Sequence, residues 1–353
     1  MAHYTPTASL EVFSERLGRP IREIIKLDAN ENPYGPSPKV QAALANLDVT
    51  HIYPDPDASK LRGMLADYLG VGEEHILVGA GVDDLIMLVM QLFIEPGDVI
   101  LNCPPTFGMY AFDAPILHAQ TVSIQRRDDF SLDLDAIEAA AFKHNAKLLI
   151  VCSPNNPSGN LIAPEELDRL LALPLVVVLD EAYIEFSETE SAARRVPSTP
   201  NLIVFRTFSK WAGLAGLRVG YGVFPLDLMQ HLWKIKQPYN LNVAADAAAR
   251  VSLADLEYLQ SNVRRIIGER ERLMDQLSEI PFLKPYPSRS NFILCRVIGL
   301  SGDQIHSALA AEGIVIRYYN QPRLYDHIRI SVGKPEQTDT LLAALRTIGA
   351  NYG

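Results

Sequence analysis

The fold is decided by residues 175–183, which read LVVVLDEAY and include Asp180 and Tyr183. A short run of branched apolar residues without period-two alternation is typical of a strand buried on both faces of a parallel sheet. Ligands of open α/β sheets bind beyond the carboxyl ends of such strands. The segment therefore predicts a central strand that ends in Asp180 at a ligand site. A helix N-cap is the alternative role for this carboxylate.

Apolar runs of the same kind lie on both sides of this segment, and helical patterns separate several of them. Alternating strands and helices predict a mostly parallel sheet between layers of helices. The expected strands span residues 76–78, 99–102, 147–152, 175–179, 201–206 and 218–223, and the expected helices span residues 83–93, 134–143 and 164–171.

The pattern changes near residues 237–242, where the alternation ends. Two helical segments follow, and the rest of the chain mixes short strands with two more helices, which is typical of a smaller α+β domain. The helical segments are expected at residues 244–259 and 260–278. We expect residues 1–34 to form an N-terminal arm that contributes to the small domain, residues 35–243 to form the large domain, and residues 244–353 the small domain.

Composition excludes several classes of protein. Of the 353 residues, 48% are hydrophobic and 21% charged, and the formal net charge is −10, which argues against a broad nucleic-acid surface. No apolar stretch approaches the ~20 residues of a membrane helix, and the first ten residues lack the pattern of a signal peptide. The three cysteines and the histidines show no metal-ligand spacing. We therefore expect a cytoplasmic protein without a bound metal. Separately, the run of acidic residues Glu185, Glu188 and Glu190 predicts an exposed loop.

Phe208, Ser209 and Lys210 follow an apolar strand, and Arg218 lies eight residues beyond the lysine. A lysine in a partly buried pocket loses its proton easily and can then form an imine. A hydroxyl and a guanidinium nearby could together hold a phosphate. A surface lysine is the alternative interpretation.

Two further segments follow predicted strands. Residues 79–84, GAGVDD, place glycines before a helix N-terminus, which suits a phosphate. They also resemble the start of a dinucleotide fingerprint, but Asp84 stands where the third glycine belongs, so a nicotinamide oxidoreductase is a weak alternative. Residues 153–160, SPNNPSGN, predict a rigid turn that can aim an amide at a ring hydroxyl, or a purely structural turn.

In this order, each at a strand-to-helix junction, the four segments resemble the pyridoxal-phosphate (PLP)-dependent aminotransferases of fold type I, over essentially the whole chain. The resemblance implies an α/β fold with a seven-stranded, mostly parallel sheet between helices in the large domain, a smaller α+β domain, and pyridoxal 5′-phosphate as cofactor. It also implies three catalytic residues: Lys210 as the Schiff-base lysine, Asp180 against the pyridine nitrogen, and Tyr183 on the ring oxygen.

The same resemblance implies the other cofactor contacts. Asn156 shares the ring oxygen with Tyr183, and the aromatic ring of Phe107, in the segment 103–110, stacks on the cofactor. Tyr53, the first residue of the segment 53–56, reaches the phosphate of the cofactor bound to the neighbouring subunit, which implies a homodimer. The phosphate is held by Val82, Asp83, Ser209 and Arg218.

Within that family, the segments 27–36, 103–110, 180–186, 313–317 and 328–333 resemble histidinol-phosphate aminotransferases. The resemblance implies a step of histidine biosynthesis: amino transfer between L-histidinol phosphate and 2-oxoglutarate, giving imidazole acetol phosphate and L-glutamate. It implies Arg317 and Arg329 as ligands of the phosphate or carboxylates, because a guanidinium fork accepts both, with Asn32 and Tyr34 as further substrate contacts. An aromatic amino-acid aminotransferase, a threonine-phosphate decarboxylase and a non-catalytic PLP-binding regulatory domain are the alternatives.

Overall fold

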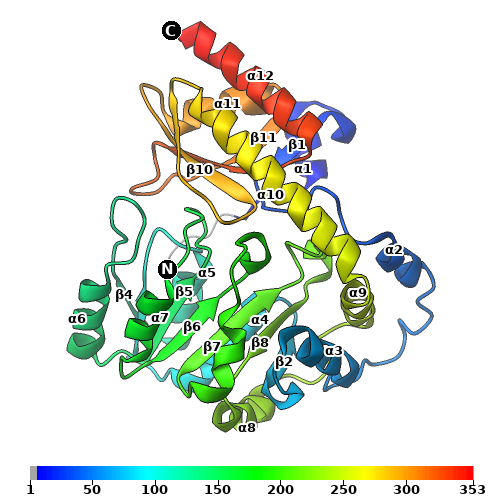
Figure 1. Cartoon of the computed structure of the whole chain (residues 1–353), viewed down its shortest axis with the longest axis vertical. Helices are drawn as coiled ribbons and strands as arrows, with labels where there is room; N and C mark the ends of the chain where they lie inside the picture. The colour runs from blue at the N-terminus through cyan, green and yellow to red at the C-terminus, as the bar shows by residue number, and fades with distance from the viewer. Residues whose placement is uncertain (1–5, 353) are drawn as a thin grey trace.

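The computed structural model describes residues 6–352, and these form two lobes, each built around one sheet (Figure 1). The sheet of the larger lobe has seven strands, six of them parallel, with β8 antiparallel to both of its neighbours. The expected mostly parallel seven-stranded sheet is confirmed. Its order is β2 (Ile76–Gly79), β8 (Gly220–Val223), β7 (Leu202–Thr207), β6 (Val176–Asp180), β5 (Leu148–Cys152), β3 (Val99–Asn102) and β4 (Gln120–Ser123).

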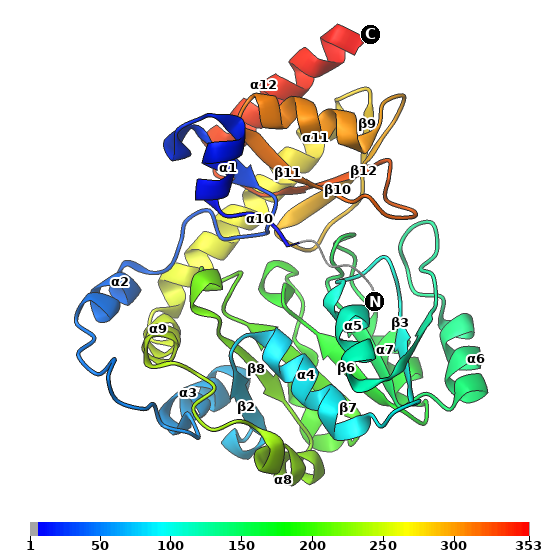
Figure 2. The ribbon, with the colours of Figure 1, turned by 180° about the vertical axis from the view of Figure 1, so that it is seen from behind.

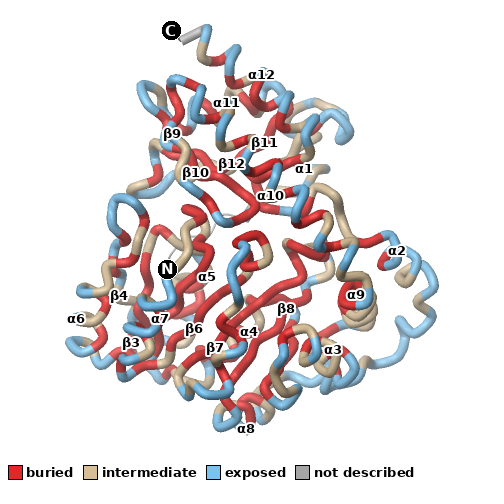
Figure 3. Tube along the Cα trace, in the orientation of Figure 1, coloured by how far each residue is buried: buried red, intermediate tan, exposed pale blue. Residues whose placement is uncertain are grey.

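The central strands are buried along their whole length, which explains the apolar runs in the sequence. Every residue of β5 and β7 is buried, because helices cover both faces of a parallel sheet (Figure 3). Figure 2 shows α4 (Val82–Phe93) lying across one face. Further helices of this lobe are α3 (Ser59–Leu69), α5 (Met109–Asp113), α6 (Leu134–His144), α7 (Pro164–Leu171) and α8 (Leu226–Ile235).

The smaller lobe combines the two ends of the chain. Strand β1 (Ile25–Leu27), from the N-terminal segment, pairs in parallel with β11 (Ile314–Tyr318) at the edge of a five-stranded sheet. The sheet continues with β12 (His327–Ser331), β10 (Phe292–Val297) and β9 (Leu283–Pro285). Helices α1 (Leu10–Leu17), α11 (Gly302–Ala311) and α12 (Pro335–Tyr352) complete it. Residues 1–5 of the expected arm lie outside the described residues.

Two helices differ from the expectation. The predicted break at residue 260 lies instead at residues 254–255, because α9 (Val243–Leu253) ends there and α10 (Leu256–Ser278) runs unbroken for 23 residues. At the break, the Asp255 carboxylate accepts hydrogen bonds from Ser37 and Lys39. Ser37 caps the helix α2 (Pro38–Ala45), and Lys39 lies in its first turn. This contact comes from a distant part of the chain, and a local pattern does not report it.

The acidic loop after Tyr183 is only partly exposed, so the expectation for Glu185 is wrong. Its side chain is 8% exposed and forms an ion pair of 2.8 Å with Arg206, whose side chain is 7% exposed. Glu188 is exposed, as expected. The difference arises because Arg206 is itself buried, at the end of β7, and a buried cation requires a partner.

Two features are absent from residues 6–352. In that part of the chain, no helix combines the length and apolar character needed to cross a bilayer. Within the same range, no three histidine, cysteine, aspartate or glutamate side chains gather as a metal would require.

Candidate active site

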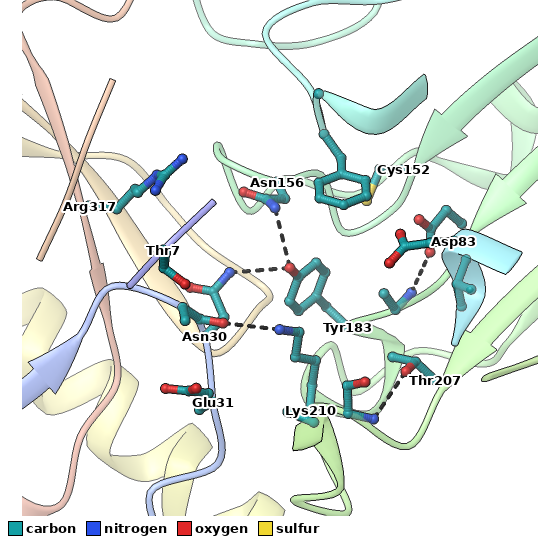
Figure 4. A pocket seen from close by; sticks show the side chains of 18 of the residues that line it. Thr7, Asn30, Glu31, Asp83, Cys152, Asn156, Tyr183, Thr207, Lys210 and Arg317 are labelled. Atoms are coloured by element: carbon teal, nitrogen blue, oxygen red, sulfur yellow. Dashed lines mark hydrogen bonds between the residues drawn. The ribbon is translucent and has the colours of Figure 1, made fainter. Parts of the chain in front are cut away.

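A cavity of about 280 Å³ lies at the carboxyl ends of β5, β6 and β7 and takes side chains from both lobes (Figure 4). It is the edge of the sheet at which the sequence predicted a ligand. Eleven of the predicted site residues line this cavity: Val82, Asp83, Phe107, Asn156, Asp180, Tyr183, Ser209, Lys210, Arg218, Arg317 and Arg329.

Lys210 lies just after β7, in the turn that leads back toward β8. Its half-buried side chain extends into the cavity, and Nζ donates a hydrogen bond of 3.0 Å to the carbonyl oxygen of Ala29. Burial, aided by the positive charge of Arg329 and opposed by Glu31, lowers the pKa of Lys210 to about 8. At pH 7 roughly a tenth of the amine is therefore neutral, far more than for an ordinary lysine, and this neutral form can act as a nucleophile or a base.

Asp180 is the last residue of β6 and is 3% exposed. One carboxylate oxygen accepts a hydrogen bond of 2.6 Å from the Tyr110 hydroxyl, and the other accepts one of 3.0 Å from the Ala182 amide. Burial raises the pKa of Asp180 to about 6, and these two hydrogen bonds oppose the rise. Asp180 does not cap a helix, since the next helical turn begins only at Ile184. At pH 7 it is a buried anion suited to a cationic N–H group.

The Tyr183 hydroxyl receives two amide donors, one from each lobe. Asn156 donates over 3.3 Å from the large lobe, and Asn30 donates over 3.2 Å from the N-terminal segment (Figure 4). Burial raises the pKa of Tyr183 above its ordinary value, so the phenol stays protonated. Because its oxygen already accepts twice, its own proton is available to an acceptor in the cavity.

An anion cradle lies where α4 begins. No side chain caps this helix, so the amides of its first turn, at Val82 and Asp83, face the cavity with the positive end of the helix dipole. Arg218 contacts Asp83 over 2.9 Å and the Ser209 hydroxyl over 3.4 Å. Gly81 has φ 86°, and a Cβ there would lie 2.5 Å from Arg218 Nη2. Glycine is favoured at this position mainly by the positive φ, which side chains rarely adopt, since the end of the Arg218 side chain can move.

Two arginines from the small lobe form the opposite wall. Arg317 and Arg329 are direct partners in the antiparallel pairing of β11 with β12, so their side chains project to the same face. Arg329 is 5% exposed and donates over 2.6 Å both to Asn156 Oδ1 and to the Asp28 carbonyl oxygen. Two adjacent guanidinium groups repel each other, so this wall attracts an anion.

Three predicted site residues lie outside the cavity lining. Asn32 donates over 2.9 Å to the carbonyl oxygen of Trp211, the neighbour of Lys210, and accepts from the Tyr34 amide. The ring of Tyr34 lies 3.7 Å beneath the guanidinium of Arg265. Tyr53 is 79% exposed on the loop between α2 and α3 and stacks on Tyr239. Substrate contact by Asn32 and Tyr34 stays a prediction.

Several lining residues were not predicted as site residues, among them Thr7, Asn30 and Glu31 of the N-terminal segment and Tyr319. Asn30 and Glu31 belong to the quoted segment 27–36, and Tyr110, which contacts Asp180, ends the quoted segment 103–110. The sequence offered one signal for these three residues: each is a polar side chain inside a segment that resembles the enzyme family. Which of them faces the cavity depends on packing between the lobes.

Comparisons with known proteins agree with this geometry. Residues 22–345 match the family described as aminotransferase class I and II. The chain is 50% identical to the histidinol-phosphate aminotransferase of Roseiflexus castenholzii, over 98% of this chain and 95% of that protein. It is 48% identical to the chloroplastic histidinol-phosphate aminotransferase 1 of Arabidopsis thaliana, over 98% and 83% of the two chains.

A solved structure is similar over nearly its full length. The histidinol-phosphate aminotransferase of Sinorhizobium meliloti, solved in complex with pyridoxal-5′-phosphate, superimposes with a TM-score of 0.91 at 30% identity. The match covers 99% of this chain and 96% of that one. The chain belongs to the aminotransferase class I and II family.

Proposed function

We propose that this chain transfers an amino group between L-histidinol phosphate and 2-oxoglutarate, giving imidazole acetol phosphate and L-glutamate, with pyridoxal 5′-phosphate as cofactor. The observation that carries the proposal is the convergence of Lys210, Asp180 and the pair Arg317 and Arg329 on one cavity. The relatives that match over most of the chain carry the same activity in their names.

The cavity residues fit this cofactor in charge and in shape. The cradle at the start of α4, with Ser209 and Arg218, suits a phosphate dianion, and the absence of a side chain at Gly81 leaves room for Arg218. The buried carboxylate of Asp180 suits a protonated ring nitrogen. We assign the ring oxygen to Tyr183 and Asn156, and a stacking contact to Phe107.

Bound pyridoxal phosphate supplies a carbonyl carbon that bonds to amines and a ring that takes up the electron pair left at a deprotonated carbon. The protein holds and moves the proton. Lys210, with its lowered pKa, would take the proton from the substrate Cα and deliver it to the cofactor carbon that carried the carbonyl oxygen. Asp180 keeps the ring nitrogen protonated. Tyr183 donates its hydroxyl proton to the ring oxygen.

The arginine pair accounts for two different substrates in one site. L-Histidinol phosphate carries a phosphate, and 2-oxoglutarate carries two carboxylates. A guanidinium fork binds either oxyanion through two parallel hydrogen bonds. We assign Arg329 and Arg317 to these anions, because their shared face on β11 and β12 lines the cavity opposite the cradle.

We also propose a homodimer in which Tyr53 contacts the cofactor phosphate of the partner subunit. The support is local: Tyr53, at 79% exposure, and Ile52, at 54%, expose apolar surface on one loop. Exposed apolar side chains that lie together mark contact surfaces. We further propose that the large domain spans residues 35–243, between an N-terminal arm and the small domain, and that the protein is cytoplasmic.

An absorbance spectrum tests the activity most directly. Protein purified with the cofactor should show the band of the lysine-bound form, and histidinol phosphate alone should convert it to the band of the aminated cofactor. Adding 2-oxoglutarate should then restore the first band and yield glutamate. Release of carbon dioxide from threonine phosphate, without amino transfer, would instead support the decarboxylase. Conversion by phenylalanine at a higher rate would support the aromatic aminotransferase.

A further inference from the structure

Asp180 receives, among the described residues, one hydrogen bond from a side chain, and it comes from Tyr110. Tyr110 lies in α5 and is 1% exposed, so water does not readily replace it. The donor–acceptor distance of 2.6 Å is typical of an O–H group that donates to a charged carboxylate. None of the roles assigned above involves Tyr110.

The direction of this hydrogen bond is fixed by the chemistry of both groups. Burial and the negative charge of Asp180 raise the pKa of Tyr110 well above its ordinary value, so the phenol keeps its proton. Asp180 in its ionised form accepts only. Tyr110 therefore donates, which favours the carboxylate over the carboxylic acid.

We propose that Tyr110 is a positioning residue that keeps Asp180 ionised and correctly turned toward the cofactor ring nitrogen. The inference rests on the proposed function and deepens it. Tyr110 is not among the residues that line the cavity, so in this account it touches neither substrate nor cofactor and acts through the Asp180 carboxylate.

The other groups around Asp180 do not replace this contact. The Ala182 amide binds the second carboxylate oxygen and holds it from the backbone. Lys210, from the turn after β7, favours the ionised form, whereas Asp83, from α4, opposes it. The Cys152 thiol, from β5, stays protonated because burial raises its pKa, and it donates its proton to the Pro154 carbonyl oxygen over 3.1 Å rather than to Asp180. Loss of the Tyr110 hydroxyl therefore leaves burial largely uncompensated at that oxygen.

The test measures the affinity of the cofactor-free protein for pyridoxal phosphate across pH 5–9, by absorbance titration, in the wild type and in Tyr110→Phe. In the wild type, affinity should fall as pH drops through about 6, where Asp180 takes up a proton. In the variant, that acid limb should move up by about one unit, as expected for a lost hydrogen bond to a charged group, so affinity should fall roughly tenfold at pH 5, about twofold at pH 7 and hardly at all at pH 9.

Two further variants separate positioning from packing. Tyr221→Phe removes the same atom from another fully buried tyrosine, on β8, and should leave the acid limb in place. Asp180→Asn cannot ionise, so Tyr110→Phe added to it should cause little further loss in a double-mutant cycle. A uniform loss of affinity at every pH, or additive effects in the cycle, would overturn the inference and leave the proposed function intact. A wild-type protein that does not bind the cofactor would overturn both.

Discussion

Lys210 donates its hydrogen bond to a carbonyl oxygen 181 residues earlier in the chain, that of Ala29. The bond joins the turn after β7, in the large lobe, to the segment that leaves β1 in the small lobe. The lysine is thus held from the side of the cavity that belongs to the smaller lobe. Any change in the position of the small lobe relative to the large one would therefore act directly on this side chain.

If the proposed roles are correct, Lys210→Ala abolishes amino transfer, because the site then loses its proton carrier and the amine that bonds to the cofactor. We expect kcat to fall by at least about a thousandfold. Stopped-flow absorbance with histidinol phosphate measures the loss. Lys60→Ala, which removes an exposed lysine of α3, is the matched control and should retain full activity.

The lowered pKa of Lys210 also predicts a stability effect in the cofactor-free protein. Between pH 8 and 10.5 the unfolded chain binds more protons at this lysine than the folded one, so stability contributed by Lys210 rises with pH there. Lys210→Met removes the penalty of the buried charge. It should stabilise the protein at pH 7 by on the order of 1 kcal/mol. Thermal unfolding should show that this advantage shrinks toward pH 10, and an advantage independent of pH would contradict the argument.

Arg329→Lys should weaken binding of both substrates, because lysine keeps the charge but cannot make the paired bonds to Asn156 and the Asp28 carbonyl while holding an anion. We expect KM for histidinol phosphate and for 2-oxoglutarate to rise roughly ten- to a hundredfold. Arg346→Lys, on the exposed surface of α12, should change neither value. A rise in only one of the two KM values would show that Arg329 binds the anion of that substrate alone, which would contradict a shared anion site.

Mixed dimers test whether Tyr53 completes the neighbouring site. Lys210→Ala and Tyr53→Ala proteins, each of low activity, are unfolded and refolded together in equal amounts. Half of the dimers are then hybrids, and each hybrid has one site with neither substitution. Activity should recover to about one quarter of the wild-type value. No recovery, with hybrids confirmed by mass, would place Tyr53 in its own subunit's site.

Glu185→Gln should destabilise the protein by up to about 3–5 kcal/mol, because it removes the carboxylate that forms a direct ion pair with the buried guanidinium of Arg206 and leaves only the more indirect charge of Glu181. Glu188→Gln is the control on the same loop. Its side chain is 60% exposed, so we expect a change within about 0.5 kcal/mol. Urea unfolding of both variants gives the comparison, and equal effects would show that the pair adds nothing.

The parts of this structure that local patterns determine were predictable. Strands β5, β6 and β7 and the residues that follow them, Asp180 and Lys210 among them, are marked by apolar runs that end in polar turns. The parallel arrangement of these strands then places those side chains at one edge. For this reason most of the predicted cofactor residues lie together.

The contacts between distant segments were not predictable in the same way. The ion pair of Glu185 with Arg206, the break before α10 and the hydrogen bond of Tyr110 to Asp180 join residues that no local periodicity links. Asn32 shows a related limit. Its segment is close to the site, but its side chain turns to the Trp211 carbonyl rather than the cavity.

Three consecutive residues after β1 each form a hydrogen bond with a different side chain that lines the cavity. The Asp28 carbonyl accepts from Arg329, the Ala29 carbonyl accepts from Lys210, and the Asn30 side chain donates to Tyr183. The parallel pairing of Leu27 with Ile316 fixes where this tripeptide begins. One inserted or deleted residue there would shift all three contacts by about 3.3 Å and exchange the faces of the segment. Gene variants that change the length of this segment should thus be far more damaging than single substitutions within it.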